Sequence, residues 1–238
     1  MIQKLSNIKE TSVTNHYTCE FCSKVFVRET SFYKHICERK RRFTNQNHPS
    51  NRIGFKTWLD FYAKNAHHKQ QRSYIDFIKS PYYLVFVKFG NYCVTSNVIN
   101  VERYVDWLFK NQIKIDYWAT DSNYTKFLIE YLRYEDAYDA IHRSIMNMVI
   151  LANNENIFGH DYLRYCNTNK ICQCITNGKI SPWILYQCES GVKFLEKLTY
   201  DQQKMIIDYI NPELWALKFT RDADLVNEIK TILKAGGY

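Results

Sequence analysis

From Tyr17 to Arg42 the chain reads YTCEFCSKVFVRETSFYKHICERKRR. The landmarks of this stretch are two cysteines, two phenylalanines and a histidine, at Cys19, Cys22, Phe26, Phe32 and His35. A segment this short buries too little apolar surface to fold on its own. Tetrahedral zinc takes thiolate and imidazole ligands, and its binding free energy can act as the folding free energy of such a segment. The stretch therefore predicts a small fold organised by zinc.

The spacing also predicts the local geometry. One tight turn directs Cys19 and Cys22 to a single point, and Phe26 ends a short hairpin. Phe32 and His35 are three residues apart and share one face of a helix, so that one packs on Phe26 while the other binds the metal. The stretch resembles the two-Cys, two-His zinc finger family. This resemblance implies a ββα finger with a closed, structural metal site.

The fourth ligand departs from the family pattern. The family places it with three to five residues between it and His35, where this chain has Arg39, Lys40 and Arg41. Cys37 is the preferred substitute, and His48 is the alternative. Because Cys37 lies roughly 200° around a helix from His35, the helix must end or distort at His35 for both side chains to reach the metal.

The resemblance also implies a surface that contacts nucleic acid. The family reads base edges from a position just before the helix and from the third and sixth helix residues, which here correspond to Arg28, Ser31 and Lys34. A basic run follows the finger and can neutralise phosphates. It consists of Arg39, Lys40, Arg41 and Arg42. With this tail, the stretch is similar to uncharacterised zinc-finger proteins of large tailed bacteriophages.

The charge of the chain is uneven. The formal net charge is +8 at pH 7 over 238 residues. Residues 1–79 hold 15 Lys and Arg against 6 Asp and Glu, and the remainder carries a net charge of −1. All excess positive charge thus accompanies the finger, which indicates a polyanionic partner. The leading hypothesis is an accessory or regulatory protein that binds nucleic acid, with double-stranded DNA the preferred form.

Composition predicts the remaining architecture. Only 7 glycines and 4 prolines are present, which favours helices with short connections. We expect a mainly α chain: a polar arm at 1–16, the finger and basic tail at 17–44, a linker at 45–51 and a mostly helical domain at 52–238. The helical domain would contact a protein partner or form a dimer.

Several helix starts can be read from capping residues. We expect Asn100 to cap a helix over 100–111, and Asp121 or Ser122 to cap the next. The dipeptides Ser181-Pro182 and Asn211-Pro212 each predict a further helix start.

The eight cysteines do not indicate disulfides, because no apolar signal segment opens the chain. No apolar run is long enough to span a membrane. A reduced, cytoplasmic protein is expected, in the host cell if the chain is encoded by a phage. Cys166, Cys172 and Cys174 with His160 are a less favoured second group of soft metal ligands, and burial of these thiols is the preferred interpretation.

Two other functions stay open. One is a protein-binding adaptor in which zinc is purely structural. The other is a metal-dependent nuclease, although the chain has no phosphate-binding glycine loop, no His-Glu-x-x-His and no nucleophile elbow. Acidic residues that a nuclease could use are better explained as a solvated, ion-paired helix surface. They are Asp116, Asp121, Glu130, Glu135, Asp136 and Asp139.

Overall fold

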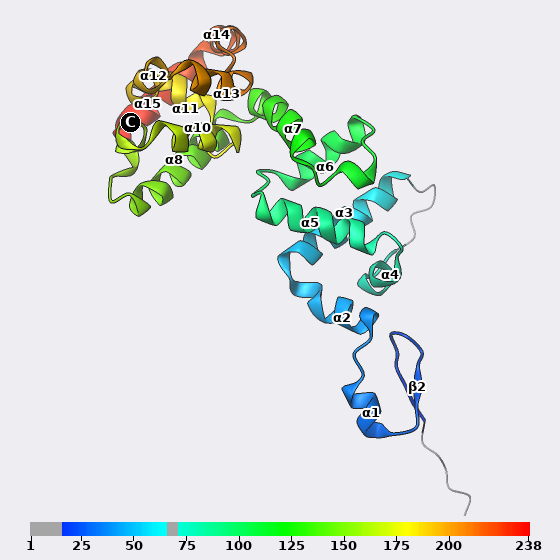
Figure 1. Cartoon of the computed structure of the whole chain (residues 1–238). Helices are drawn as coiled ribbons and strands as arrows, with labels where there is room; N and C mark the ends of the chain where they lie inside the picture. Colours follow the sequence, from blue (N-terminus) through cyan, green and yellow to red (C-terminus); the bar gives the residue numbers. More distant parts are fainter. Residues whose placement is uncertain (1–15, 66–70) are drawn as a thin grey trace, which may run out of the picture. The chain divides into compact units, whose positions relative to one another are not determined.

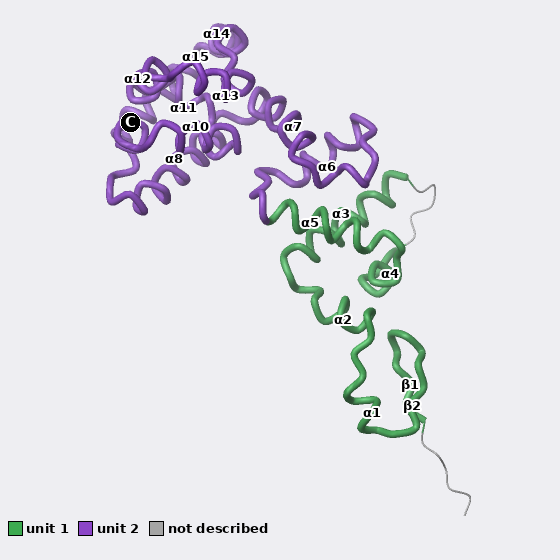
Figure 2. The backbone as a smooth tube through the Cα atoms, viewed as in Figure 1, with its two compact units in different colours: residues 1–94 green, residues 95–238 purple. Residues whose placement is uncertain are grey.

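A computed structural model describes residues 16–65 and 71–238. Within these residues the chain forms fifteen α-helices and one two-stranded hairpin (Figure 1). This confirms the predicted class, a mainly helical chain that begins with a small finger. The chain divides into two compact units, residues 1–94 and 95–238 (Figure 2). The polar arm expected at 1–16 lies, except for His16, outside the described residues.

The finger opens unit 1. Strands β1 (Tyr17–Thr18) and β2 (Val25–Phe26) pair antiparallel, with Tyr17 opposite Phe26. Helix α1 (Glu29–Lys34) follows, and α2 (Glu38–Thr44) carries the basic run. Neither helix buries a residue. Packing alone therefore contributes little to holding this part of the chain together.

The helical part of unit 1 begins where a linker was expected. Residues 45–51 form a 3₁₀ turn, η1 (Asn45–Asn47), and the first turn of α3 (Pro49–Asn65). The Asn51 side chain donates a hydrogen bond to the Asn45 carbonyl at 2.6 Å, which stabilises this compact turn. Helices α4 (Tyr74–Lys79) and α5 (Tyr83–Thr95) complete the unit.

Two glycines let α3 and α5 cross at close range. A Cβ atom on Gly54 would lie 2.7 Å from the Phe86 carbonyl oxygen, and one on Gly90 would lie 2.0 Å from that of Ser50. Neither contact is possible for a larger residue without moving backbone. The crossing supports a core that includes Trp58, Phe77, Phe86 and Phe89, each at most 1% exposed.

Unit 2 is helical throughout its described secondary structure. It begins with α6 (Val101–Lys110), the turn η2 (Ile115–Tyr117), α7 (Asp121–Tyr134) and α8 (Ala137–Asn154). Short elements follow: η3 (Gly159–Asp161), α9 (Tyr162–Tyr165), α10 (Thr168–Thr176), α11 (Pro182–Gln187) and α12 (Glu189–Glu196). The unit ends with α13 (Tyr200–Ile210), α14 (Pro212–Arg221) and α15 (Ala223–Ala235).

Most of the predicted caps are present. The side chains of Asn100, Ser181 and Asn211 accept backbone N–H bonds at the starts of α6, α11 and α14. The expectation for α7 is wrong, because Thr120 occupies the capping position and makes no side-chain cap. Its hydroxyl instead donates to the Tyr117 carbonyl at 2.9 Å, so the preceding turn has taken the group that could have capped the helix.

The buried residues of unit 2 are mostly apolar. Trp183 and Trp215 meet at 6.1 Å between ring centroids, and both are at most 2% exposed. One ion pair is buried among these helices: the Arg143 guanidinium donates to both oxygens of Glu135, whose side chain is 0% exposed. Ser181 also donates to Glu135, at 2.8 Å. Packing and a satisfied polar group together hold this unit.

The division after Val94 differs from the expected helical domain at 52–238. Helix α5 ends at the boundary and α6 follows it closely, so the succession of helices does not mark it. In the described part of the chain, no helix combines the length and the apolar character that crossing a membrane requires.

Candidate metal centre

A tight turn after β1 positions the first two cysteines. The Cys19 N–H donates to the Lys24 carbonyl at 2.9 Å, and the Ser23 N–H donates to the Cys19 carbonyl at 2.8 Å. Ser23 has a φ of 59°, the left-handed conformation that closes such a turn. The turn brings Cys22 back toward Cys19, as the two-residue gap predicts.

Helix α1 ends where the ligand geometry requires it to end. His35 leaves the helical conformation, with φ −73° and ψ 118°, while its N–H still donates to the Phe32 carbonyl. The His35 ring packs on Phe26 at 4.8 Å between centroids, and Phe32 lies 6.1 Å from Phe26. This confirms the inward face predicted from the spacing. The extended backbone after α1 then lets Cys37 turn back toward the same point.

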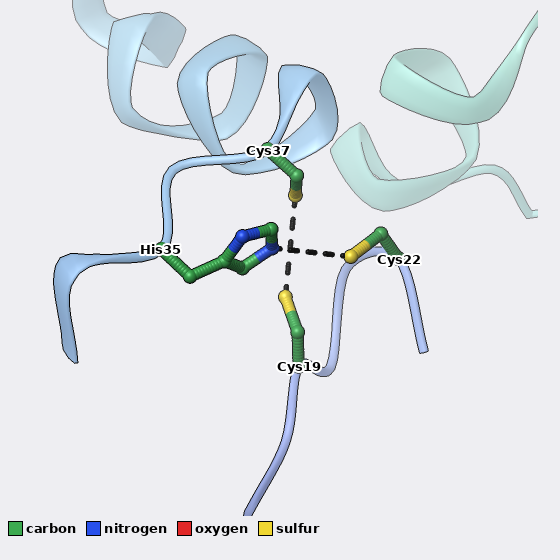
Figure 3. A group of neighbouring side chains, drawn as sticks. All are labelled: Cys19, Cys22, His35 and Cys37. Carbon is green, nitrogen blue, oxygen red and sulfur yellow. Dashed lines mark hydrogen bonds between the residues drawn. The ribbon is translucent and has the colours of Figure 1, made fainter. Parts of the chain in front are cut away.

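Four ligand atoms converge at this point. The side chains of Cys19, Cys22, His35 and Cys37 point toward a common centre (Figure 3), and their ligand atoms all lie within 4.8 Å of one another. The Sγ atoms of Cys19 and Cys37 are 4.0 Å apart, and Cys22 Sγ lies 3.2 Å from His35 Nε2. Two sulfurs bound to tetrahedral zinc at about 2.3 Å would be about 3.8 Å apart. The group is therefore positioned to bind one metal ion.

The cysteine pair of the turn is electrostatically uneven. Burial opposes ionisation of Cys19, but backbone N–H bonds from Cys22 and Phe21 outweigh it and lower the pKa of the Cys19 thiol. For Cys22, the Lys24 N–H favours the thiolate, yet burial and the neighbouring thiols prevail and raise its pKa. Cys19 is accordingly the thiol that ionises more readily, and the thiolate is the form that binds metal.

The structure distinguishes the two candidates for the fourth ligand. Cys37 belongs to the converging group, whereas His48 lies at the end of η1 and is not part of it. Cys37 also serves as the N-cap of α2, because its Sγ accepts a hydrogen bond from the Lys40 N–H at 3.4 Å. The same side chain thus faces the metal centre and starts the basic helix.

The less favoured cysteine group in unit 2 does not form a comparable site. Among residues 16–65 and 71–238, the finger's group is the one set of three or more His, Cys, Asp or Glu residues with ligand atoms this close. Cys172 and Cys174 are buried, and burial raises the pKa of both thiols. Cys174 lies 3.8 Å from the Tyr162 hydroxyl, which accounts for it as a packed thiol.

The first half of the basic run is bound to the finger backbone. Arg39 donates to the Phe21 carbonyl at 3.2 Å, inside the cysteine turn. Lys40 donates to the His35 carbonyl at 3.5 Å. Each contact reaches a residue that is, or adjoins, a metal ligand. Two of the four cations of the basic run are therefore bonded to the backbone of the candidate metal centre.

Arg42 has a different role from the other cations of the run. It donates to the Ile78 carbonyl at 3.0 Å, lies 4.4 Å above the Tyr83 ring and pairs with Glu38, and its side chain is only 19% exposed. Its carbonyl accepts a hydrogen bond from the Tyr74 hydroxyl at 3.2 Å. Arg42 fastens α2 to α4 and α5, which leaves Arg41 as the more exposed end of the run.

The remaining predicted contacts lie on or beside α1. Arg28 occupies the N-cap position of α1, and Ser31 and Lys34 follow at intervals of three residues. All three are exposed. The structure thus leaves these side chains accessible but shows nothing that they bind.

The acidic residues considered for a nuclease have structural partners in several cases. Glu135 is buried against Arg143. Asp136 caps α8 by accepting the backbone N–H groups of Tyr138 and Asp139. Glu130 accepts a hydrogen bond from the Trp107 indole at 2.7 Å. These contacts account for half of the acidic set as parts of the fold.

A chain of aromatic contacts was not predicted. Phe43 directly follows the basic run. Its ring centroid lies 5.1 Å from that of Phe21 in the cysteine turn and 6.3 Å from that of Tyr74 on α4. Tyr74 in turn contacts Phe55 on α3 at 5.2 Å. The sequence does show an aromatic residue, Phe43, near the end of a short cationic helix. Its two partners cannot be read from the sequence, because both are distant from it along the chain. This chain of rings links the metal centre to the helices of unit 1.

Comparison with known proteins identifies no relative: no family model matches the sequence, and neither a curated protein nor a solved structure is significantly similar to it.

Proposed function

We propose that this protein binds nucleic acid, double-stranded DNA in the first instance, through a zinc-organised finger and its basic helix. Zinc suits the donor set, because three thiolates and one imidazole are soft and borderline ligands in a closed group. The metal would be structural. Cytoplasmic location and a bacteriophage origin belong to the same proposal and rest on the resemblance of the finger.

One observation carries this proposal. Cys37 both faces the metal centre and caps α2, and the side chains of Arg39 and Lys40 bond to carbonyls of the finger. Metal binding would therefore hold a row of cations in a defined position instead of leaving them on a mobile tail. Ordered cations lose less conformational entropy when they contact phosphates.

The test uses the metal-loaded full chain and measures affinity for a DNA duplex across a range of salt concentrations. The variant Lys34→Gln with Arg41→Gln removes two exposed cations that do not bond to the finger backbone. If both contact phosphates, the slope of log K against log salt should flatten by about 2. The matched control, Lys230→Gln with Lys234→Gln on α15, removes the same charge from unit 2 and should leave the slope unchanged.

The adaptor remains the second candidate, because the finger exposes several apolar side chains. Val27, Tyr33 and Ile36 are each at least 65% exposed. Such a surface can serve a protein partner. An unchanged slope in the Lys34 and Arg41 variant would contradict the nucleic-acid proposal and favour this candidate. Arg28→Ala then separates base reading from phosphate contact, since only base reading predicts a changed sequence preference.

A further inference from the structure

Unit 1 contains an open hollow of about 630 Å³ beside the basic helix. Its size falls within the range of roughly 300–1,000 Å³ that is usual for small-ligand sites. It lies where η1, the start of α3 and the start of α4 meet. The lining residues that bear on its chemistry are Gln46, Asn47, Arg52, Phe55, Lys56 and Tyr74.

Two aromatic rings of the hollow are packed against neighbouring side chains. Phe55 and Tyr74 pack edge to face at 5.2 Å with an interplanar angle of 78°. Phe55 also contacts Trp58 at 6.1 Å, and the Tyr74 hydroxyl donates to the Arg42 carbonyl. Both rings nevertheless remain partly exposed. A fixed, partly exposed ring is a suitable surface for stacking a base.

Two cationic side chains also line the hollow. Arg52 and Lys56 are one helical turn apart on α3, and both are exposed. The described lining contains no carboxylate. An anion in the hollow would therefore be attracted by the two cations. Their spacing suits two consecutive phosphates, or one phosphate between them.

Amide side chains complete the set. Gln46 and Asn47 enter the hollow from η1. Each amide offers a hydrogen-bond donor and an acceptor, the combination that matches the edge of a base. Rings for stacking, cations for phosphate and amides for a base edge are the three interactions that a nucleotide requires.

We infer that this hollow binds an unpaired nucleotide of the nucleic acid that the finger contacts. The inference rests on the proposed function and extends it by naming the form of the ligand. A fully paired duplex keeps its base faces stacked and cannot offer one to Phe55 or Tyr74, whereas a single-stranded tail or an extruded base can. The preferred ligand is then a duplex with an unpaired segment.

The experiment compares two ligands with the metal-loaded full chain: a fully paired DNA duplex, and the same duplex with a short single-stranded tail that carries the fluorescent base 2-aminopurine. The tail should increase affinity by roughly tenfold, as expected for one stacked base. Stacking on a ring should also change the fluorescence of the 2-aminopurine. Both effects report on the tail alone.

Three variants locate the effect. Arg52→Gln with Lys56→Gln should abolish most of the gain from the tail and leave affinity for the paired duplex within about twofold. Phe55→Leu keeps an apolar side chain but removes one of the two rings, so it should reduce the fluorescence change. Lys79→Gln with Lys88→Gln removes two exposed cations that do not line the hollow, and should retain both effects.

The outcomes separate this inference from the proposed function. In one outcome, the chain binds the two ligands equally, while the Lys34 and Arg41 substitutions weaken the binding of both. This result overturns the inference about the hollow and is consistent with the proposed function. If the Arg52 and Lys56 variant loses the gain from the tail while the Lys34 and Arg41 variant binds normally, the inference about the hollow is supported. The role proposed for the finger is then contradicted. Failure of the metal-loaded chain to bind either ligand overturns both.

Discussion

The finger and unit 2 are stabilised in opposite ways. Within residues 16–37 a single residue, Cys19, is buried, and α1 and α2 bury none. In unit 2 four of the six residues of α11 are buried, and this short helix contacts α8, α12 and α15. We expect the first region to depend on a metal ion bound by four converging side chains, whereas the second depends on apolar area distributed over many contacts. A substitution should therefore affect one region without the other.

The largest expected effect is the loss of a metal ligand. Structural zinc contributes about 10–16 kcal/mol of apparent binding free energy in zinc-finger peptides, so Cys37→Ser should lower metal affinity by orders of magnitude. Serine is a favourable N-cap, and the substitution therefore keeps the start of α2 while it removes the thiolate. Competition with a chelator measures the affinity, and thermal unfolding of unit 2 should not change.

The control for this prediction is His48→Ala, which lies outside the converging group and should bind metal as the unsubstituted chain does. If His48→Ala weakens metal binding and Cys37→Ser does not, the ligand set is wrong.

The next effect should appear in unit 2 alone. Glu135→Gln leaves the Arg143 guanidinium, 17% exposed, without its charge partner. Breaking such a buried pair typically costs about 3–5 kcal/mol, and denaturant unfolding of unit 2 should show a loss of this size. Metal affinity should stay unchanged.

Glu189→Gln is the matched control, because its partner Lys193 is on the same exposed helix face and surface pairs contribute about 0–1 kcal/mol. A loss at Glu135 no larger than the loss at Glu189 would show that the buried pair does not stabilise the unit.

The smallest expected effect concerns the contact between the finger and the helices of unit 1. Phe43→Leu removes the ring that contacts both Phe21 and Tyr74. Aromatic pairs contribute about 0.5–1.5 kcal/mol beyond burial, so unfolding of the metal-loaded unit 1 should become easier by about 1 kcal/mol. After removal of the metal the difference should shrink, because Phe21 is then no longer held in place.

Phe158→Leu serves as the comparison for Phe43, since Phe158 stacks on His160 in unit 2 and is 73% exposed. A similar loss at Phe158 would mean that the Phe43 effect comes from general hydrophobicity and not from the link.

Prediction from sequence succeeded where the determinants are close together in the chain. The caps at Asn100, Ser181 and Asn211 are present because a cap joins residues two or three positions apart. The N-cap of α7 was predicted wrongly. The Thr120 hydroxyl bonds backward to the Tyr117 carbonyl and does not cap the helix, and residue spacing alone does not decide between these two local arrangements. The polar composition of residues 45–51 favours a linker or turn, but it does not reveal that the Asn51 side chain closes this turn by donating to the Asn45 carbonyl.

The pattern of residues was enough to predict the mainly helical class and three residues of the candidate metal centre, Cys19, Cys22 and His35, with Cys37 preferred over His48 as the fourth. Both are local: coordination chemistry specifies ligand types and spacing, and the break after His35 follows from helix geometry once Cys37 is a ligand. Tertiary structure decided which cations are accessible, since Arg42 is held by Ile78 and Tyr83. It also decided the partner of Glu135 and the hollow beside α3. These features join residues that are far apart in sequence, and only the packing of helices brings them within contact distance.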